Sequence, residues 1–174
     1  TDGKVLVTPP ESSEIYCLDL RTGKALWHHR QGDSLFIAGV DHGNVLLVSG
    51  QSVTACRLSD GDPAWKKETT PLPSGALPAG QGYLSEGRYY LPLTSGQIAE
   101  IDMATGALET YPPAGGSASL GNLICYRGSV ISQSPLVVDK FEQLDILRKR
   151  TEEAITRNAN DATAIRESAE LMRA

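Results

Sequence analysis

The sequence predicts a mainly β fold: a partial β-propeller of about three to four four-stranded blades, followed by a short α-helical segment. The stretch "LDLRTGKALW" (18–27) returns as "CRLSDGDPAW" (56–65) and, in eroded form, as "IDMATGALET" (101–110). The turn glycines of these copies are 38 and 45 residues apart. Self-similarity at a period of about 40 to 45 residues is typical of four-stranded propeller blades. All 17 glycines and all 10 prolines precede residue 136. This change in composition predicts a different kind of structure, the helical segment, in the residues that follow.

A second repeated marker is a glycine that stands before an apolar run. It occurs as Gly3 before "KVLV", Gly43 in "VDHGNVLLVSG", Gly87 in "LSEGRYYLPLTSG" and Gly128 in "CYRGSVISQS". The gaps of 40, 44 and 41 residues agree with the period of the first marker. Two independent markers therefore indicate the same repeat.

Hydrophobic periodicity and turn residues predict strands of about five or six residues. Within a blade the strands are named A to D in chain order. We expect A strands near 34–40, 82–85 and 122–126, B strands near 4–8, 44–49, 88–93 and 129–133, C strands near 14–20, 52–58, 97–102 and 136–139, and D strands near 25–29, 64–68 and 107–111. The first blade then lacks its A strand and the last its D strand.

The repeated motif itself closes a hairpin between strands C and D. Its Asp or Thr can hydrogen-bond the local backbone, and its glycine supplies a positive φ. Trp27 and Trp65 follow four residues after the glycine, on the expected D strand. We expect these rings to fill the wedge between neighbouring blades rather than to stack on a cofactor.

Residues 140–174 carry balanced charges, seven basic and seven acidic, and predict two amphipathic helices. The sequence "NAND" (158–161) separates them, with Asn160 or Asp161 as the N-cap of the second. The expected apolar faces are Leu144, Leu147, Thr151, Ala154 and Ile155 on the first helix, and Ala162, Ile165, Ala169 and Met172 on the second. We therefore divide the chain into a propeller domain, 1–139, and a helical domain, 140–174.

Composition excludes several classes of function. The net charge is −5 and basic residues do not cluster, which disfavours a nucleic-acid groove. The sequence contains no apolar run of the roughly 18 residues that a membrane span needs, and no signal peptide at its start. Because it opens at Thr1 in the middle of a repeat, we expect a soluble piece of a longer product.

Few residues are candidates for catalysis or for binding a metal or cofactor, and each of them also has a structural interpretation. Cys17, Cys56 and Cys125 lack metal-ligand spacing, and we expect small buried strand residues. Asp41, His42 and Asn44 are the strongest loop candidates for a ligand set, but they stand in a hairpin and we expect them to serve its turn. His28 and His29 follow Trp27 on an outer strand, where a metal role is doubtful. We assign no catalytic, cofactor-binding or metal-binding residue, and no cofactor.

Two further segments have predictable roles. Tyr89 and Tyr90 are expected to form one packed ring and one edge ring. The loop 73–82 is not followed by a helix, so it is a flexible loop rather than a phosphate cradle. The stretch "TTPLPSGALP" (69–78) is an expected excursion between blades, where a propeller would carry partner contacts.

The repeated motif resembles the repeat of pyrroloquinoline-quinone-type propellers, Ala-x-Asp-x-x-Thr-Gly-Lys-x-x-Trp, over about residues 1–139. Asp19 and Asp102 match its Asp, while Arg57 and Thr110 depart from it. Such repeats occur in quinoprotein dehydrogenases, in an outer-membrane assembly lipoprotein of Gram-negative bacteria and in many non-catalytic propellers. The sequence of the chain is most similar to that of large envelope proteins of planctomycete-type bacteria, in which a tetratricopeptide-like helical region follows the propeller.

The resemblance implies one of two functions. The favoured one is a non-catalytic propeller that acts as an interaction scaffold in a larger protein of the periplasm or cell envelope. The alternative is a fragment of a quinone-dependent dehydrogenase whose metal and cofactor residues lie on other blades. Because three and a half blades cannot close a ring, we expect a protein partner or self-association, such as a homodimer that completes a propeller. The alternative is an open array of sheets whose ends are covered by the C-terminal helices.

Overall fold

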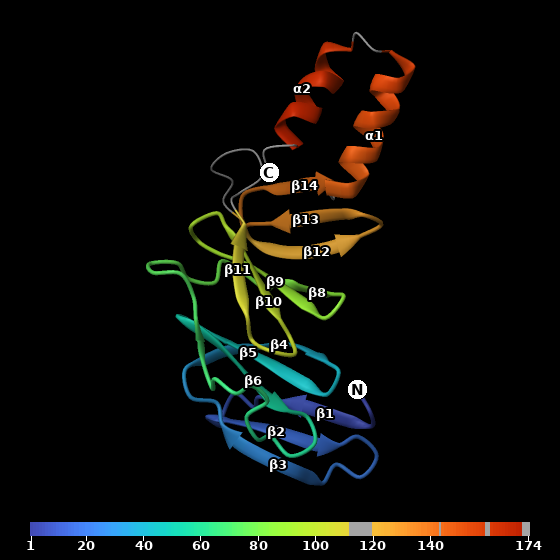
Figure 1. Ribbon diagram of the computed structural model, residues 1–174. Coiled ribbons are helices and arrows are strands. Elements are labelled where there is room, and N and C mark those ends of the chain that lie inside the picture. Colours follow the sequence, from blue (N-terminus) through green and yellow to red (C-terminus); the bar gives the residue numbers. More distant parts are fainter. Residues whose placement is uncertain (112–119, 143, 159–160, 172–174) are drawn as a thin grey trace. The chain divides into compact units, whose positions relative to one another are not determined.

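The computed structural model describes residues 1–111, 120–142, 144–158 and 161–171, which belong to two compact units, Thr1–Leu123 and Ile124–Ala174 (Figure 1). The described chain is mainly β, with four antiparallel sheets and two helices. This confirms the predicted fold class. In these residues neither helix has the length and apolar content needed to cross a membrane.

Each sheet consists of strands that follow one another in the chain. The first sheet holds β1 (Lys4–Val7), β2 (Glu14–Asp19) and β3 (Ala25–Arg30); the second β4 (Ser34–Asp41), β5 (Asn44–Ser49), β6 (Ser52–Arg57) and β7 (Thr70–Pro71); the third β8 (Tyr83–Ser85), β9 (Arg88–Pro92), β10 (Ile98–Asp102) and β11 (Leu108–Tyr111); and the fourth β12 (Asn122–Tyr126), β13 (Ser129–Gln133) and β14 (Val138–Glu142). The first and fourth sheets have three strands each. In the described residues the first thus lacks strand A and the fourth strand D, as predicted.

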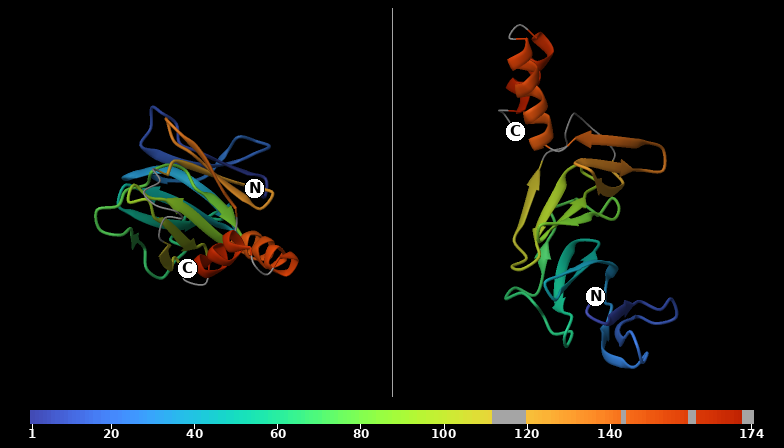
Figure 2. Two further views of the ribbon diagram at one scale, coloured as in Figure 1. Left: turned by 90° about the horizontal axis from the view of Figure 1, so that it is seen from above. Right: turned by 90° about the vertical axis from the view of Figure 1, so that its right-hand side faces the viewer.

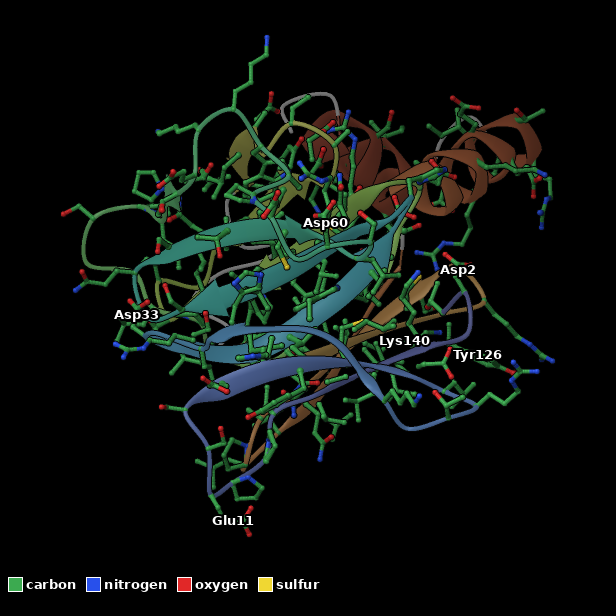
Figure 3. The ribbon with its side chains drawn as sticks, turned by 90° about the horizontal axis from the view of Figure 1, so that it is seen from below. Asp2, Glu11, Asp33, Asp60, Tyr126 and Lys140 are labelled. Atoms are coloured by element: carbon green, nitrogen blue, oxygen red, sulfur yellow. The ribbon has the colours of Figure 1, made fainter. Side chains whose placement is uncertain are left out.

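The second repeated glycine marks the hairpin turns between strands A and B. Each is preceded by a residue that also has a positive φ, as at His42 (46°) and Gly43 (82°). Consecutive positive φ angles define the tight two-residue turn that matches the twist of paired strands, and glycine adopts them without strain. Figure 3 shows Asp2 of the first such turn at one end of β1 and Glu11 beyond the other end.

The predicted outer strand at 64–68 is wrong. In the second sheet Pro63 forms an isolated bridge with Cys56, and the paired outer strand is the two-residue β7, opposite Ser52 and Val53. Residues 66–69 between them are exposed. Pro63 lacks a backbone N–H for the ladder, and Trp65 beyond it is buried, 5% exposed, in the core shared with the third sheet.

Two clusters of buried side chains hold the sheets of the first unit together. One joins the first and second sheets, and the other joins the second and third. Tyr89, 1% exposed, lies in the latter, and its hydroxyl oxygen accepts a hydrogen bond of 2.7 Å from the Gly82 amide. The Tyr90 ring is half-buried and stacks on Tyr83, with ring centroids 4.9 Å apart. One tyrosine is packed and one lies at the edge, as predicted.

The fourth sheet extends further along the chain than predicted. Strand β14 runs to Glu142 and pairs Phe141 with Val130, so Lys140–Glu142 belong to a strand and not to a helix. Phe141 favours a strand because an aromatic side chain packs well on a pleated sheet. The change from strands to helices thus falls between residues 142 and 144.

Two helices follow, α1 (Leu144–Arg157) and α2 (Ala162–Leu171), and they lie side by side (Figures 1 and 2). The Asp161 carboxylate accepts hydrogen bonds from the amides of Thr163 and Ala164, at 3.0 and 3.1 Å, so Asp161 is the N-cap.

The apolar face predicted for α2 is wrong at the residues that can be compared. Ala164 is buried, 4% exposed, whereas Ala162 and Ile165 are exposed. Small side chains allow two helices to approach closely, and Ala164 offers one where Ile165 does not. On α1, Thr151 is buried as predicted and Ala154 and Ile155 are half-buried. The remaining predicted face residues, Leu144, Leu147, Ala169 and Met172, lie outside the described side chains, and Asn160 outside the described residues.

Candidate interaction surfaces

The repeated motif forms the turns between strands C and D. In the first and third sheets the motif Asp accepts hydrogen bonds within the turn: Asp102 from the amide and hydroxyl of Thr105, at 2.8 and 2.9 Å, and Asp19 from those of Thr22, both at 2.7 Å. These threonine hydrogen bonds hold the pKa of both carboxyl groups below the usual range. The aspartates are thus committed to turn structure.

The second turn replaces this Asp with Arg57 and compensates for the change. The Arg57 guanidinium pairs with Asp60, at 3.1 Å, and with Asp62, at 2.9 Å, and Asp60 in turn accepts the Asp62 amide at 3.0 Å. The second turn is therefore held by an arginine that pairs with two aspartates, whereas the other two turns are held by an aspartate that accepts hydrogen bonds from a threonine.

Each tryptophan binds the turn of the next sheet. The Trp27 indole nitrogen donates to the Leu58 carbonyl oxygen at 3.0 Å. The Trp65 nitrogen donates to the Met103 carbonyl at 3.1 Å. This confirms that the indoles pack between blades, although Trp65 reaches its place from outside a strand.

The turn glycines allow this close approach. A Cβ atom on Gly61 would lie 2.9 Å from the Trp27 ring and 2.3 Å from His29, and one on Gly106 would lie 2.5 Å from the Trp65 ring. Both glycines also have positive φ angles, 81° and 74°. The glycine is thus required by the turn and by the indole that covers it.

The strongest predicted ligand candidates serve an A–B hairpin. Asp41 pairs with the His42 ring nitrogen at 2.8 Å, and this hydrogen bond raises the pKa of His42. Asn44 donates to the Met103 carbonyl at 3.0 Å. These residues line a hollow of about 280 Å³ together with Glu86 and Arg88. Asp41 and His42 are thus paired with each other, and the Asn44 amide nitrogen holds the neighbouring sheet.

His28 and His29 point to opposite faces of β3, because alternate residues of a strand do so. His28 stacks on Tyr16 and lies 3.2 Å from Glu14. His29 lies beside Trp27, with ring centroids 5.5 Å apart. The two rings thus share no site. In the described ranges no group of three His, Cys, Asp or Glu side chains has the arrangement of a metal site.

In the described part of the chain no disulfide joins Cys17, Cys56 and Cys125. Cys17 is fully buried and Cys56 half-buried in the core between the first two sheets. Burial raises the pKa of Cys56 to about 11. Cys125 is half-buried. The interpretation of Cys17 as a small buried strand residue is confirmed.

A second hollow, of about 340 Å³, lies where the outer strand of the second sheet is interrupted. Trp27, Cys56 and Pro63 line its apolar part. Its charged lining residues, Arg30 and Glu68, are exposed and therefore solvated. The hollow, which His29 also lines, offers a surface for side-chain contacts.

The excursion at 69–78 is anchored to the sheets rather than flexible. Leu72 and Ala76 are buried in the core, and Leu77 exchanges hydrogen bonds of 2.8 and 3.0 Å with Thr94. Leu77 remains 48% exposed. Because local apolar periodicity is weak here, the sequence did not reveal these long-range anchors.

The fourth sheet exposes large apolar side chains. Ile124 and Tyr126 alternate on β12 and therefore share one face, with exposed fractions of 54% and 59%. Figure 3 labels Tyr126 and, on the same sheet, Lys140. Leu136, Val137 and Val138 are also exposed, at 93%, 50% and 69%. We call these five residues the fourth-sheet apolar set. Sequence reasoning missed this set because the alternation of a strand does not show which face a neighbour covers.

Solved structures share this fold. The chain has a TM-score of 0.60 and 16% identity to the computationally designed Ika4 protein, covering 82% of this chain and 87% of that one. Against BamB from Moraxella catarrhalis the values are 0.55 and 22%, over 81% and 46%. Against the N-terminal domain of Nup159 they are 0.53 and 8%, over 80% and 41%. The chain thus spans less than half the length of the last two.

No protein with a curated description matches the chain. A family model described as outer membrane protein assembly factor BamB matches residues 1–165. With its repeated turns, four antiparallel sheets and inter-sheet tryptophans, the chain belongs to this family of pyrroloquinoline-quinone-type propeller repeat proteins.

Proposed function

We propose that the chain is a non-catalytic propeller segment that acts as an interaction scaffold within a larger protein of the cell envelope. The observation that carries this proposal is the fourth-sheet apolar set. Large apolar side chains are exposed on β12, on β14 and on the turn before β14, and a partner would cover them, because exposed apolar area is costly in water.

The distribution of polar groups supports the same function. The motif aspartates close turns, Asn44 binds the neighbouring sheet and Asp41 binds His42. A quinone-dependent dehydrogenase needs hard oxygen ligands directed at a metal, which acts as a Lewis acid on the quinone. Here the best candidates for such ligands have structural partners instead.

The incomplete end sheets indicate how a partner would bind. A strand edge with unpaired backbone groups is a site of strand addition. The first sheet lacks strand A and the fourth lacks strand D in the described residues, so a second propeller segment, including another copy of the chain, could supply both. The α1–α2 pair would begin a tetratricopeptide-like array beyond the propeller.

Membership of a family named for outer-membrane protein assembly supports a location in the periplasm or cell envelope. In that setting the scaffold would hold envelope proteins together through sheet faces and loops, the elements by which rigid folds present contacts.

The proposal is tested by replacing Ile124 and Tyr126 with lysine. The immobilised chain is used to capture proteins from a cell-envelope extract, which are identified by mass spectrometry. We expect the double variant to lose a defined set of captured proteins while keeping its melting temperature. Leu35→Lys is the matched control, because Leu35 is as exposed as Tyr126, 59%, but lies on the second sheet. Equal capture by all three proteins would contradict the proposal.

A further inference from the structure

The turn between β13 and β14 presents Leu136, which is 93% exposed, to solvent (Figure 1). The Ser134 amide donates to the Val137 carbonyl at 2.9 Å, and the Ser134 hydroxyl oxygen accepts the Val137 amide at 3.1 Å. These hydrogen bonds fix the backbone on both sides of Leu136. We call residues 134–137 the apolar turn. The corresponding turns of the second and third sheets carry the polar stretches "GQ" (50–51) and "TSGQ" (94–97).

The second hollow, of about 340 Å³, lies where the outer strand of the second sheet is interrupted. In the third sheet β11 pairs with four consecutive residues of β10. In the second sheet the pairing with β6 is reduced to a bridge at Pro63 and the two residues of β7, and the exposed residues 66–69 leave the ladder between them. The space next to β6 therefore stays open. Its apolar walls are Ile15, Trp27, Leu47, Cys56 and Pro63.

The apolar turn and the second hollow complement each other in size and in chemistry. The volume of the hollow exceeds that of one aliphatic side chain, and an exposed leucine on a fixed turn gains free energy when apolar walls cover it. Charged residues border both features. Asp139 and Lys140 follow the apolar turn on β14, and Arg30 and Glu68 line the hollow, so each side offers both signs to the other.

We propose that the apolar turn of one copy of the chain inserts Leu136 into the second hollow of another copy. This contact rests on the proposed scaffold function, of which it names one partner. The hollow belongs to the unit Thr1–Leu123 and the apolar turn to the unit Ile124–Ala174, so every copy carries both surfaces. The contact is heterologous, and it assembles copies head to tail into a ring or an open array.

Light scattering of the 174-residue chain over a range of concentrations measures this assembly. We expect a mean mass that rises with concentration above that of one chain. Leu136→Asp should weaken the association by about tenfold or more, because a carboxylate at the tip of the turn is costly to bury among apolar walls. Melting temperatures establish that this and the following variants are folded.

Two variants block the second hollow. Thr54 is half-buried on β6 and lines the hollow, so Thr54→Phe fills it from within the strand, where an aromatic residue is well tolerated. Thr69→Trp blocks it from an exposed position and serves if Thr54→Phe lowers the melting temperature. Either variant should weaken the association as much as Leu136→Asp does.

Mixing the two kinds of variant tests whether both act on one contact. Leu136→Asp keeps an open hollow, and the variant with the blocked hollow keeps an unchanged apolar turn. Equal amounts of the two should therefore form a complex of two chains and no larger species. Leu35→Asp is the matched control: Leu35 is 59% exposed on β4, and its variant should assemble like the parent chain.

A parent chain that stays monomeric at every concentration overturns the proposed contact, and so does a mixture in which both variants remain monomers. Loss of assembly in Leu35→Asp overturns it as well, because the association would then not depend on the apolar turn. Ile124 and Tyr126 are unchanged in all these variants, so the capture experiment tests the proposed function separately. A monomeric chain that still captures envelope proteins through Ile124 and Tyr126 refutes the contact alone, and assembly without such capture refutes the function alone.

Discussion

The indole nitrogen of Trp65 donates a hydrogen bond to the carbonyl oxygen of Met103, 38 residues further along the chain and 3.1 Å away. Both side chains are buried, so this bond links the second and third sheets inside their shared core. The bond explains why an indole recurs at a fixed distance from the turn glycine.

Trp65→Phe should lower the free energy of unfolding by about 1 kcal/mol, because the buried Met103 carbonyl loses one of its two donors and keeps the Asn44 side-chain amide. Urea unfolding followed by circular dichroism measures the change. Tyr16→Phe is a control whose hydroxyl partner, the half-buried Glu14, keeps 32% of its side chain exposed to water, and it should cost less than half as much. Equal costs would show that the indole bond does not stabilise the sheet pair.

Gly106→Ala should destabilise the chain more than Gly23→Ala. Both substitutions place a Cβ atom at a positive φ, which costs about 1–2 kcal/mol. The methyl on Gly106 also meets the Trp65 ring at 2.5 Å, and overpacking adds about 1–3 kcal/mol. Thermal unfolding of the two variants gives the comparison, and a larger effect at Gly23 would contradict the account.

Tyr89→Phe should cost about 1–2 kcal/mol of unfolding free energy, since the Gly82 amide loses its acceptor. The neighbouring Tyr90→Phe is the matched control: that ring is half-buried and stacks on Tyr83, an interaction that phenylalanine retains. Denaturant unfolding of both variants measures the difference, which should vanish if the Tyr89 hydroxyl has no structural role.

The Asp102 turn should weaken in acid. Hydrogen bonds from Thr105 hold the folded-state pKa of Asp102 below the unfolded value of about 3.9. Its contribution is therefore complete above that unfolded pKa and is lost as the pH falls through the lower, folded one. Asp102→Asn cannot titrate, so its stability should fall less than that of the unchanged chain between pH 5 and pH 2, the range to be covered by urea titrations. Asp19→Asn should behave in the same way. If the stability of the variant and that of the unchanged chain fell equally with pH, the hydrogen-bonded aspartate would not be the cause of the loss in acid.

Cys56 should react slowly with iodoacetamide in the folded chain. Burial raises its pKa to about 11, so the reactive thiolate should increase about tenfold per pH unit between pH 8 and pH 10. Mass spectrometry of the alkylated peptides follows this residue separately from Cys17. The chain unfolded in urea is the control, in which the rate should level off near the ordinary thiol pKa of about 8.5. A plateau near that pKa in the folded chain would mean that the thiol is not shielded.

Local features of the sequence were enough to predict most strands and turns. The glycines of the hairpins need positive φ angles that other residues rarely adopt, so Gly43 and Gly106 marked their turns directly. The position of Trp65 was not predictable in this way. Trp27 makes the equivalent contact from within β3, so the indole contact does not by itself end a strand. Pro63, which lacks a backbone N–H, stands where pairing in the second sheet is reduced to a single bridge.

The candidate surfaces were less accessible to sequence reasoning than the fold. Leu20, Leu58 and Met103 share an apolar position three residues before the turn glycine, which is a signal that the motif contains. The sequence does not show that Leu58 and Met103 are covered while Leu20 is exposed, because coverage depends on the neighbouring sheet. The same reason hid the fourth-sheet apolar set.

The most direct test of the scaffold function is calorimetric titration of the 174-residue chain with pyrroloquinoline quinone in the presence of calcium, with its melting temperature recorded in parallel. The account predicts no saturable heat and an unchanged melting temperature, since Asp41 and the motif aspartates Asp19 and Asp102 are hydrogen-bonded within their own turns. Tight saturable binding with a raised melting temperature would contradict it and would identify the chain as part of a quinone-dependent dehydrogenase.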